Sequence, residues 1–137
     1  MIDLVHRAIA LAGSPLFEAL EPEPLLEIAE RARSETVAAG AVLFARGDDS
    51  ETVFVVVRGR LVLEREGGVR EELGPGQLAG ELPALEGEPR GATATALEAC
   101  ELVRIEPDHL IDILSDHPEV VRALALNLAR RVRASAK

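Results

Sequence analysis

The feature that most limits the fold of this chain is a run of five apolar residues, Val-Phe-Val-Val-Val, at positions 53–57. Side chains alternate between the two faces of a β-strand, so a strand with one face in water shows a polar residue at every second position. This run has none, and its β-branched residues favour extended backbone. We therefore expect 53–57 to form a central strand that is covered on both faces.

Shorter runs of the same kind recur on either side of the central one and are separated by Gly, Asp or Pro. Gaps this regular between short strands are typical of a β-sandwich or a barrel. Two pairs, Arg58-Gly59 and Gly67-Gly68, lie between neighbouring runs, and we expect both to be hairpin turns. The expected strands are 36–37, 41–44, 52–57, 60–65, 69–73, 92–97 and 101–105.

Apolar residues at helical spacing occur before and after this region. They predict helices at 3–11, 22–33, 107–114 and from 118 to the end of the chain. Asp3 is well placed to cap the first helix, and prolines stand at the start of the other three.

The last expected helix carries one apolar stripe, formed by Val121, Leu124, Leu128 and Val132. A stripe of this kind packs either on the domain that carries it or on a second copy of the chain. The sequence leaves both alternatives open.

Length and charge exclude several classes of protein. The 137 residues suit one domain. The 24 acidic and 15 basic side chains give a net charge of −9, and no Trp or Tyr is present, so we expect no direct contact with nucleic acid. The first residues have the pattern of neither a signal peptide nor a membrane span, so we expect no direct contact with a membrane.

The cysteine and histidine residues argue against an enzyme. Cys100 is the only cysteine, so we expect a buried structural thiol in a protein of the reducing cytoplasm. His6, His109 and His117 all fall in predicted helices, whereas a metal-dependent barrel needs ligands that converge from its strands. Neither a Gly-x-Ser-x-Gly elbow nor a P-loop occurs. We expect no catalytic activity, no metal and no cofactor.

One segment carries a pattern with a chemical use. The residues 80–87 read as a short helical turn enclosed by glycines, with an acid at Glu81 and an arginine nine residues later at Arg90. The first N–H groups of a helix attract an anion, and an arginine can grip two phosphate oxygens at once. An acid beside such a site can accept a hydrogen bond from a ribose hydroxyl. The alternative is a surface ion pair between Glu81 and Arg90, and the pattern alone does not separate the two.

The same segment resembles a known motif. Gly80-Glu81-Leu82 followed by Gly87-Glu88-Pro89-Arg90-Gly91-Ala92-Thr93 is similar to the phosphate-binding cassette of the cyclic nucleotide-binding domain. That family includes the sensor domains of catabolite activator protein, of protein kinase A regulatory subunits and of nucleotide-gated channels. The resemblance covers nearly the whole chain. The other positions that carry it are Pro15-Leu16-Phe17, Gly40, Gly47, Gly59 and Leu73-Gly74-Pro75-Gly76.

The resemblance implies a mainly β fold, a β-roll of the jelly-roll type, with N-terminal helices and two C-terminal helices. A single domain would consist of a helical lead-in at 1–34, a β-roll at 35–106 with the cassette at 80–93, and C-terminal helices at 107–137. In such a cassette Glu81 would hold the ribose 2′-OH and Arg90 the cyclic phosphate. The expected ligand-binding residues are Gly80, Glu81, Leu82, Arg90, Gly91, Ala92 and Thr93.

The residues around the cassette arginine bear on which nucleotide is bound. In members of the family that prefer cGMP, a Thr or Ser directly after this arginine can bond guanine, whereas this chain has Gly91. We therefore expect cAMP rather than cGMP, with Thr93 as a fallback contact on the same face of the strand.

Two positions depart from the family pattern. Ala79 stands where a bulky Phe is common, and Pro83 stands where the family usually offers an N–H to the phosphate. A missing charge-assisted hydrogen bond costs about 1.5–3 kcal/mol, which is one to two decades of affinity.

The resemblance predicts a regulatory sensor that binds a cyclic mononucleotide and relays the binding through its C-terminal helices. The alternative is a degenerate roll that binds no nucleotide and acts as a packing or dimerisation module. The expected partners are the nucleotide and either a second copy or a fused effector. Because the chain stops at Lys137, we expect no DNA-reading helix-turn-helix and either a stand-alone sensor or a fragment.

Overall fold

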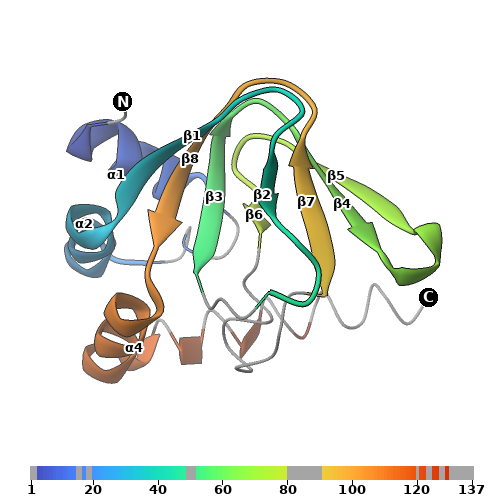
Figure 1. The fold of residues 1–137 in the computed structure, drawn as a ribbon. Helices are drawn as coiled ribbons and strands as arrows, with labels where there is room; N and C mark the ends of the chain where they lie inside the picture. Colours follow the sequence, from blue (N-terminus) through green and yellow to red (C-terminus); the bar gives the residue numbers. More distant parts are fainter. Residues whose placement is uncertain are drawn as a thin grey trace.

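The computed structural model describes residues 3–14, 17, 20–48, 52–79, 91–119, 121–122, 125–126 and 129. In these residues the chain forms two four-stranded antiparallel sheets, with helices against the outer face of the first sheet (Figure 1). The expected class, a mainly β-roll with flanking helices, is confirmed.

The strand order is β1-β8-β3-β6 in the first sheet and β2-β7-β4-β5 in the second. The first sheet consists of β1 (Arg33–Val37), β8 (Cys100–Ile105), β3 (Val53–Arg58) and β6 (Leu78–Ala79). The second consists of β2 (Val42–Phe44), β7 (Ala92–Ala96), β4 (Leu61–Arg65) and β5 (Arg70–Leu73). The expected runs account for all of these strands except β6, whose two residues are too few to produce a pattern.

The strand β3 has a core on each face. Val53 and Val55, 1% and 0% exposed, pack into the core beneath the helices. Phe54 and Val56 point the other way, into the core between the two sheets. Each fully buried Val or Phe contributes about 1.5–3 kcal/mol. The prediction of a central strand covered on both faces is confirmed.

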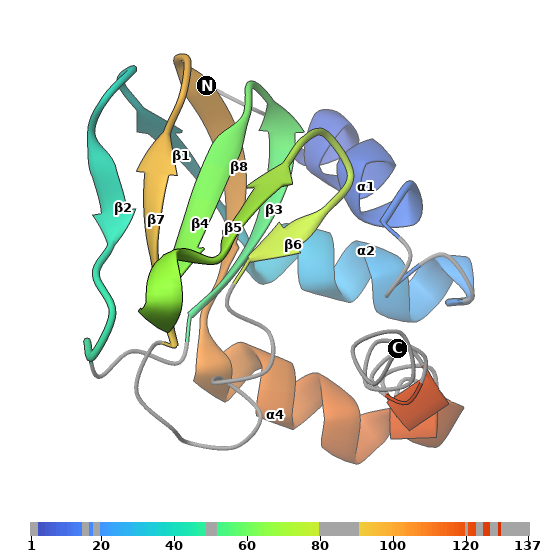
Figure 2. The same cartoon turned by 90° about the vertical axis from the view of Figure 1, so that its right-hand side faces the viewer.

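Two helices at the start of the chain cover the outer face of the first sheet (Figure 2). They are α1 (Leu4–Ala12) and α2 (Pro22–Arg31). Asp3 caps α1 as expected, because its Oδ1 accepts a hydrogen bond of 2.9 Å from the backbone N–H of His6. The helical residues that they bury in this core include Leu11, Ile28 and Ala29.

Helical structure also follows the last strand. The helix α4 (Pro107–Asp116) begins at the expected proline, and its Ile113 is 2% exposed in the core beneath the helices. The residues described between 118 and 129 are helical, and Val121 among them is 48% exposed. The rest of the apolar stripe lies outside the described residues, so both alternatives for it stay predictions. No helix in the described part of the chain has the length and apolar character needed to cross a membrane.

One of the two expected hairpin turns is confirmed and the other is wrong. Gly67 and Gly68, both at positive φ, connect β4 to β5, which pair with each other. Arg58-Gly59 connects β3 to β4, but these strands lie in different sheets. The reason is that β8 and β6 already occupy both edges of β3. The turn at Gly59 therefore carries the chain from one sheet to the other.

Gly59 is required at this turn for two reasons. Its φ is +92°, a conformation that L side chains rarely adopt. A Cβ at this position would also lie 2.5 Å from the carbonyl oxygen of Ala99 and 2.8 Å from Sγ of Cys100. The connection between the sheets is thus packed directly against the start of β8.

We expect Gly59→Ala to destabilise the protein more than Gly67→Ala does. Both substitutions place a side chain at positive φ, which costs about 1–2 kcal/mol, but nothing lies within 4 Å of a Cβ at Gly67. The additional loss of unfolding free energy in Gly59→Ala measures the clash of the new Cβ with Ala99 and Cys100. Urea unfolding of the two variants tests this, and equal losses would contradict it.

Candidate functional site

The cassette sequence connects the two sheets. Four of the seven expected site residues, Gly80, Glu81, Leu82 and Arg90, lie outside the described residues, as does Pro83. The strands on either side are described: β6 precedes the cassette in the first sheet, and β7 contains its last residues in the second. The expected roles of Glu81 and Arg90 therefore stay predictions, while the framework that holds both ends of the cassette is defined.

The cassette ends at the start of β7. Ala92 is 5% exposed and packs in the core between the sheets, so its backbone is the part of this residue that can serve a ligand. Gly91 is exposed, and the nearest atom to a Cβ placed there is Nη1 of Arg65 at 3.9 Å. Packing of the described residues therefore does not require glycine at 91.

Thr93 holds the loop after β2. Its Oγ1 accepts a hydrogen bond of 3.0 Å from the backbone N–H of Arg46. The same loop is closed locally, because Oδ2 of Asp48 accepts a bond of 2.9 Å from the N–H of Ala45. Thr93 was expected to be a fallback ligand contact, and the structure gives its hydroxyl oxygen a partner within the protein. We interpret it as a positioning residue that ties this loop to the end of the cassette.

Arg65 is a charged neighbour of the cassette that sequence reasoning missed. It is the register partner of Ala92, and its guanidinium lies beside Gly91. Its Nη2 is 3.4 Å from Oε1 of Glu71 on β5, in an ion pair with both side chains nearly half exposed. Arg65 comes close to the cassette because β4 pairs with β7, and no local sequence pattern predicts this pairing. Arg65 places a positive charge beside Gly91, which directly follows the expected phosphate ligand Arg90 in the sequence.

Ala79, one of the two departures from the family pattern, lies buried in the core between the sheets. Ala79 is 1% exposed and is the register partner of Phe54 on β3. The ring of Phe54 stacks on Phe44, with 6.1 Å between the ring centroids, and all three residues belong to the core between the sheets. The small side chain of Ala79 therefore lies next to two large rings, which β3 and β2 contribute to the same core.

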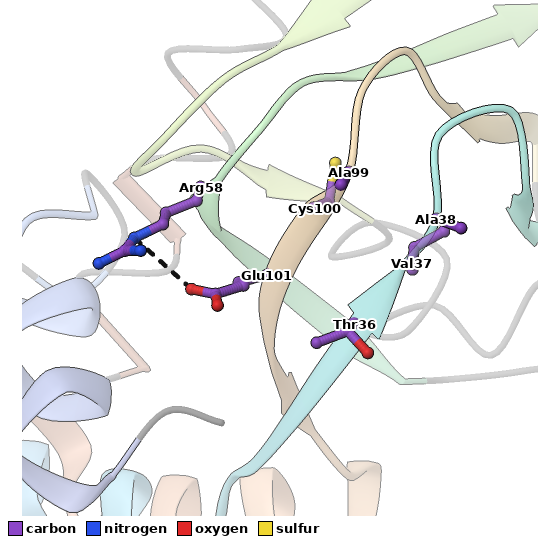
Figure 3. A pocket seen from close by; sticks show the side chains of 7 residues that line it. All are labelled: Thr36, Val37, Ala38, Arg58, Ala99, Cys100 and Glu101. Atoms are coloured by element: carbon purple, nitrogen blue, oxygen red, sulfur yellow. Dashed lines mark ion pairs between the residues drawn. The ribbon is translucent and has the colours of Figure 1, made fainter.

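A hollow of about 400 Å³ opens at the other end of the sheets (Figure 3). Arg58 and Glu101 form an ion pair of 3.5 Å at it. It lies near the start of β8, whereas the cassette meets the opposite end of β7. It is therefore separate from Gly91 and Ala92, at the end of the cassette that the structure describes. Its lining residues are Thr36, Val37, Ala38, Arg58, Ala99, Cys100 and Glu101.

Cys100, which borders this hollow, is buried as expected. Its side chain donates to the carbonyl oxygens of Glu98 and Arg60, at 3.2 and 3.4 Å. Burial raises the pKa of the thiol, and a protonated thiol is a poor nucleophile. Among the described residues no group of three or more His, Cys, Asp or Glu side chains is arranged to hold a metal ion.

The chain matches a family model described as the cyclic nucleotide-binding domain. The match covers residues 34–117, which is more than half of the chain. It runs from β1 to the end of α4 and includes the whole cassette sequence.

Three relatives show the range of proteins that contain such a segment. A cyclic nucleotide-gated potassium channel of Mesorhizobium japonicum is 34% identical over 134 residues, 98% of this chain and 37% of the channel. The crystal structure of Thermus thermophilus catabolite activator protein has a TM-score of 0.80 at 32% identity, covering 90% of this chain and 60% of that one. The regulatory domain of Toxoplasma gondii PKA, co-crystallised with cAMP, has a TM-score of 0.74 at 29% identity, covering 82% and 45%. The chain thus spans less than two thirds of each relative.

If Thr93 positions the loop, then Thr93→Val should destabilise the protein by about 1 kcal/mol, because the N–H of Arg46 loses its acceptor. Thr93→Ser keeps the oxygen and should retain most of the stability. Urea unfolding of the two variants measures the difference. A Val variant as stable as the Ser variant would show that the bond does not hold the loop.

Proposed function

Because the chain belongs to the cyclic nucleotide-binding domain family, we propose that it is a regulatory module that binds a cyclic mononucleotide, with cAMP preferred to cGMP. Binding would pass through the C-terminal helices to a partner, which is a second copy or a fused effector. The observation that carries this proposal is the cassette sequence of residues 80–93, which lies inside the family match at 34–117.

The chemistry of the cassette suits this ligand. Arg90 would bind the cyclic phosphate through two N–H groups, and the carboxylate of Glu81 would accept a hydrogen bond from the ribose 2′-OH. The backbone of Ala92 would add a donor, and Gly91 offers no hydroxyl to guanine. The regulatory domain of Toxoplasma gondii PKA holds cAMP in its co-crystal structure, which supports the ligand class. We place the module in the cytoplasm, without direct contact with membrane or nucleic acid, as a sensor and not an enzyme.

One sequence feature favours a second function, a roll that binds no nucleotide and serves only for packing or dimerisation. Pro83 has no N–H to offer the phosphate. The other departure, Ala79, lends this alternative little support, because Phe54 fills the core opposite it. Which of the two functions is correct therefore depends on how far the missing N–H of Pro83 weakens nucleotide binding.

Calorimetric titration with cAMP and with cGMP tests the proposal. We expect micromolar or tighter binding of cAMP, weaker binding of cGMP, and a loss of more than about tenfold in Arg90→Ala because the charge-assisted phosphate bonds are removed. Arg60→Ala is the matched control, since Arg60 pairs with Glu72 at the opposite end of β4 from Arg65. Unchanged affinity in Arg90→Ala would refute the site.

The same titration with Pro83→Ala separates the two functions. Binding by the natural sequence supports the sensor. No binding by the natural sequence but binding by Pro83→Ala would mean an intact pocket that lacks one donor. No binding by either would support the packing module, and sedimentation would then test for a dimer.

A second prediction concerns Arg65, whose guanidinium lies beside Gly91. We expect Arg65→Gln to weaken nucleotide binding roughly two- to threefold at low salt and less at high salt, because an exposed charge is screened. Arg60→Gln removes the same charge from another paired arginine of similar exposure, 50% against 46%. Equal effects of the two variants would show that only net charge matters.

A further inference from the structure

The helix α4 is fixed to the β-roll through the residue that precedes it. Glu106, directly before it, accepts a bond of 2.6 Å from Nε of Arg104 and one of 3.3 Å from the hydroxyl of Thr52. Midway along α4, Asp112 pairs with Arg31 of α2 at 3.2 Å. The start and middle of α4 are thus tied to their neighbours through Glu106 and Asp112.

The other end of α4 is followed by a histidine, whose charge changes with pH. His117 follows α4 and directly precedes the last helical segment, with its side chain 19% exposed. Its Nε2 is 2.7 Å from Oε2 of Glu27 on α2, and its Nδ1 is 3.3 Å from Oε1 of Glu119 in the last helical segment. The two nitrogens of one ring therefore face carboxylates from two different elements.

Only the imidazolium can serve both carboxylates. A neutral imidazole carries one N–H, so it donates to one carboxylate and presents a lone pair to the other. The charged groups that face the ring are Glu27 from α2 and Glu119 from the last helical segment; Arg31 of α2 is engaged by Asp112. The hydrogen bond that the ring donates to the carboxylate of Glu27 raises the pKa of His117, and this effect outweighs the opposing effect of partial burial.

We propose that His117 is a proton-operated latch between α2 and the last helical segment. When the ring is protonated it holds Glu27 and Glu119 together, and when it is neutral it releases one of them. The latch needs no nucleotide, so it can be tested apart from the proposed function. It makes the attachment of the last helical segment sensitive to pH.

The direction of the effect on stability follows from the raised pKa. A histidine whose pKa is higher in the folded than in the unfolded state adds stability that is fully present below its ordinary value of 6.5. That stability is lost as the pH rises through the folded-state pKa.

Two measurements on the whole chain test the latch. In the first, NMR titration follows the imidazole ring of His117, and we expect its pKa to fall in Glu27→Gln and, by less, in Glu119→Gln. In the second, thermal unfolding of His117→Gln is compared with the natural sequence at about pH 5.5 and about pH 8.5. The deficit in Tm should be larger at the lower pH.

Each outcome bears on the proposal. A deficit that is the same at both pH values would show that His117 only packs, and a His117 titration that neither glutamine variant moves would remove the latch. Either result overturns the proposal. If one of the glutamine variants fails to fold, the other still shows whether its carboxylate changes the pKa of His117.

Discussion

The burial of both faces of β3 is the constraint on which the rest of the structure depends. Val53 and Val55 face the helices while Phe54 and Val56 face the second sheet, so one strand belongs to two cores. A strand of this kind cannot lie at the surface, and its neighbours β8 and β6 occupy both of its edges. The chain leaving β3 therefore has to cross to the other sheet, which it does at Gly59.

The cassette and α4 follow different strands of the first sheet. The cassette sequence leaves the first sheet at β6 and returns in the second at β7. The helix α4 follows β8, which lies next to β3, and contacts α2 through Asp112 and through the histidine after its last turn. The elements that would bind a ligand and those that would pass on the binding are thus joined through the first sheet.

Much of the fold was predictable because its signals are local. The apolar run of β3, the Asp3 cap and the prolines that open α2 and α4 each act within a few residues. The turn at Gly59 was predicted wrongly because a glycine between two strands does not say whether those strands pair. The cassette was identified by its motif. The contacts around it and around the last helix were not, because they join residues far apart in the sequence: 26 positions for Arg65 and Gly91, 47 for Arg46 and Thr93, and 90 for Glu27 and His117. Contacts of that kind follow from strand pairing and helix packing, which the sequence order does not display.

The pairing of Phe54 with Ala79 also limits which substitutions the core between the sheets can accept. The large ring on β3 and the small side chain on β6 lie at partner positions in one core, next to the stacked ring of Phe44. An interior packed to constant density fixes the summed volume of such a pair, not the identity of either member. A larger side chain at 79 would therefore need a smaller one at 54 to fill the same space. A single substitution at either position changes the volume of the pair, and only a matched change on both strands would keep it.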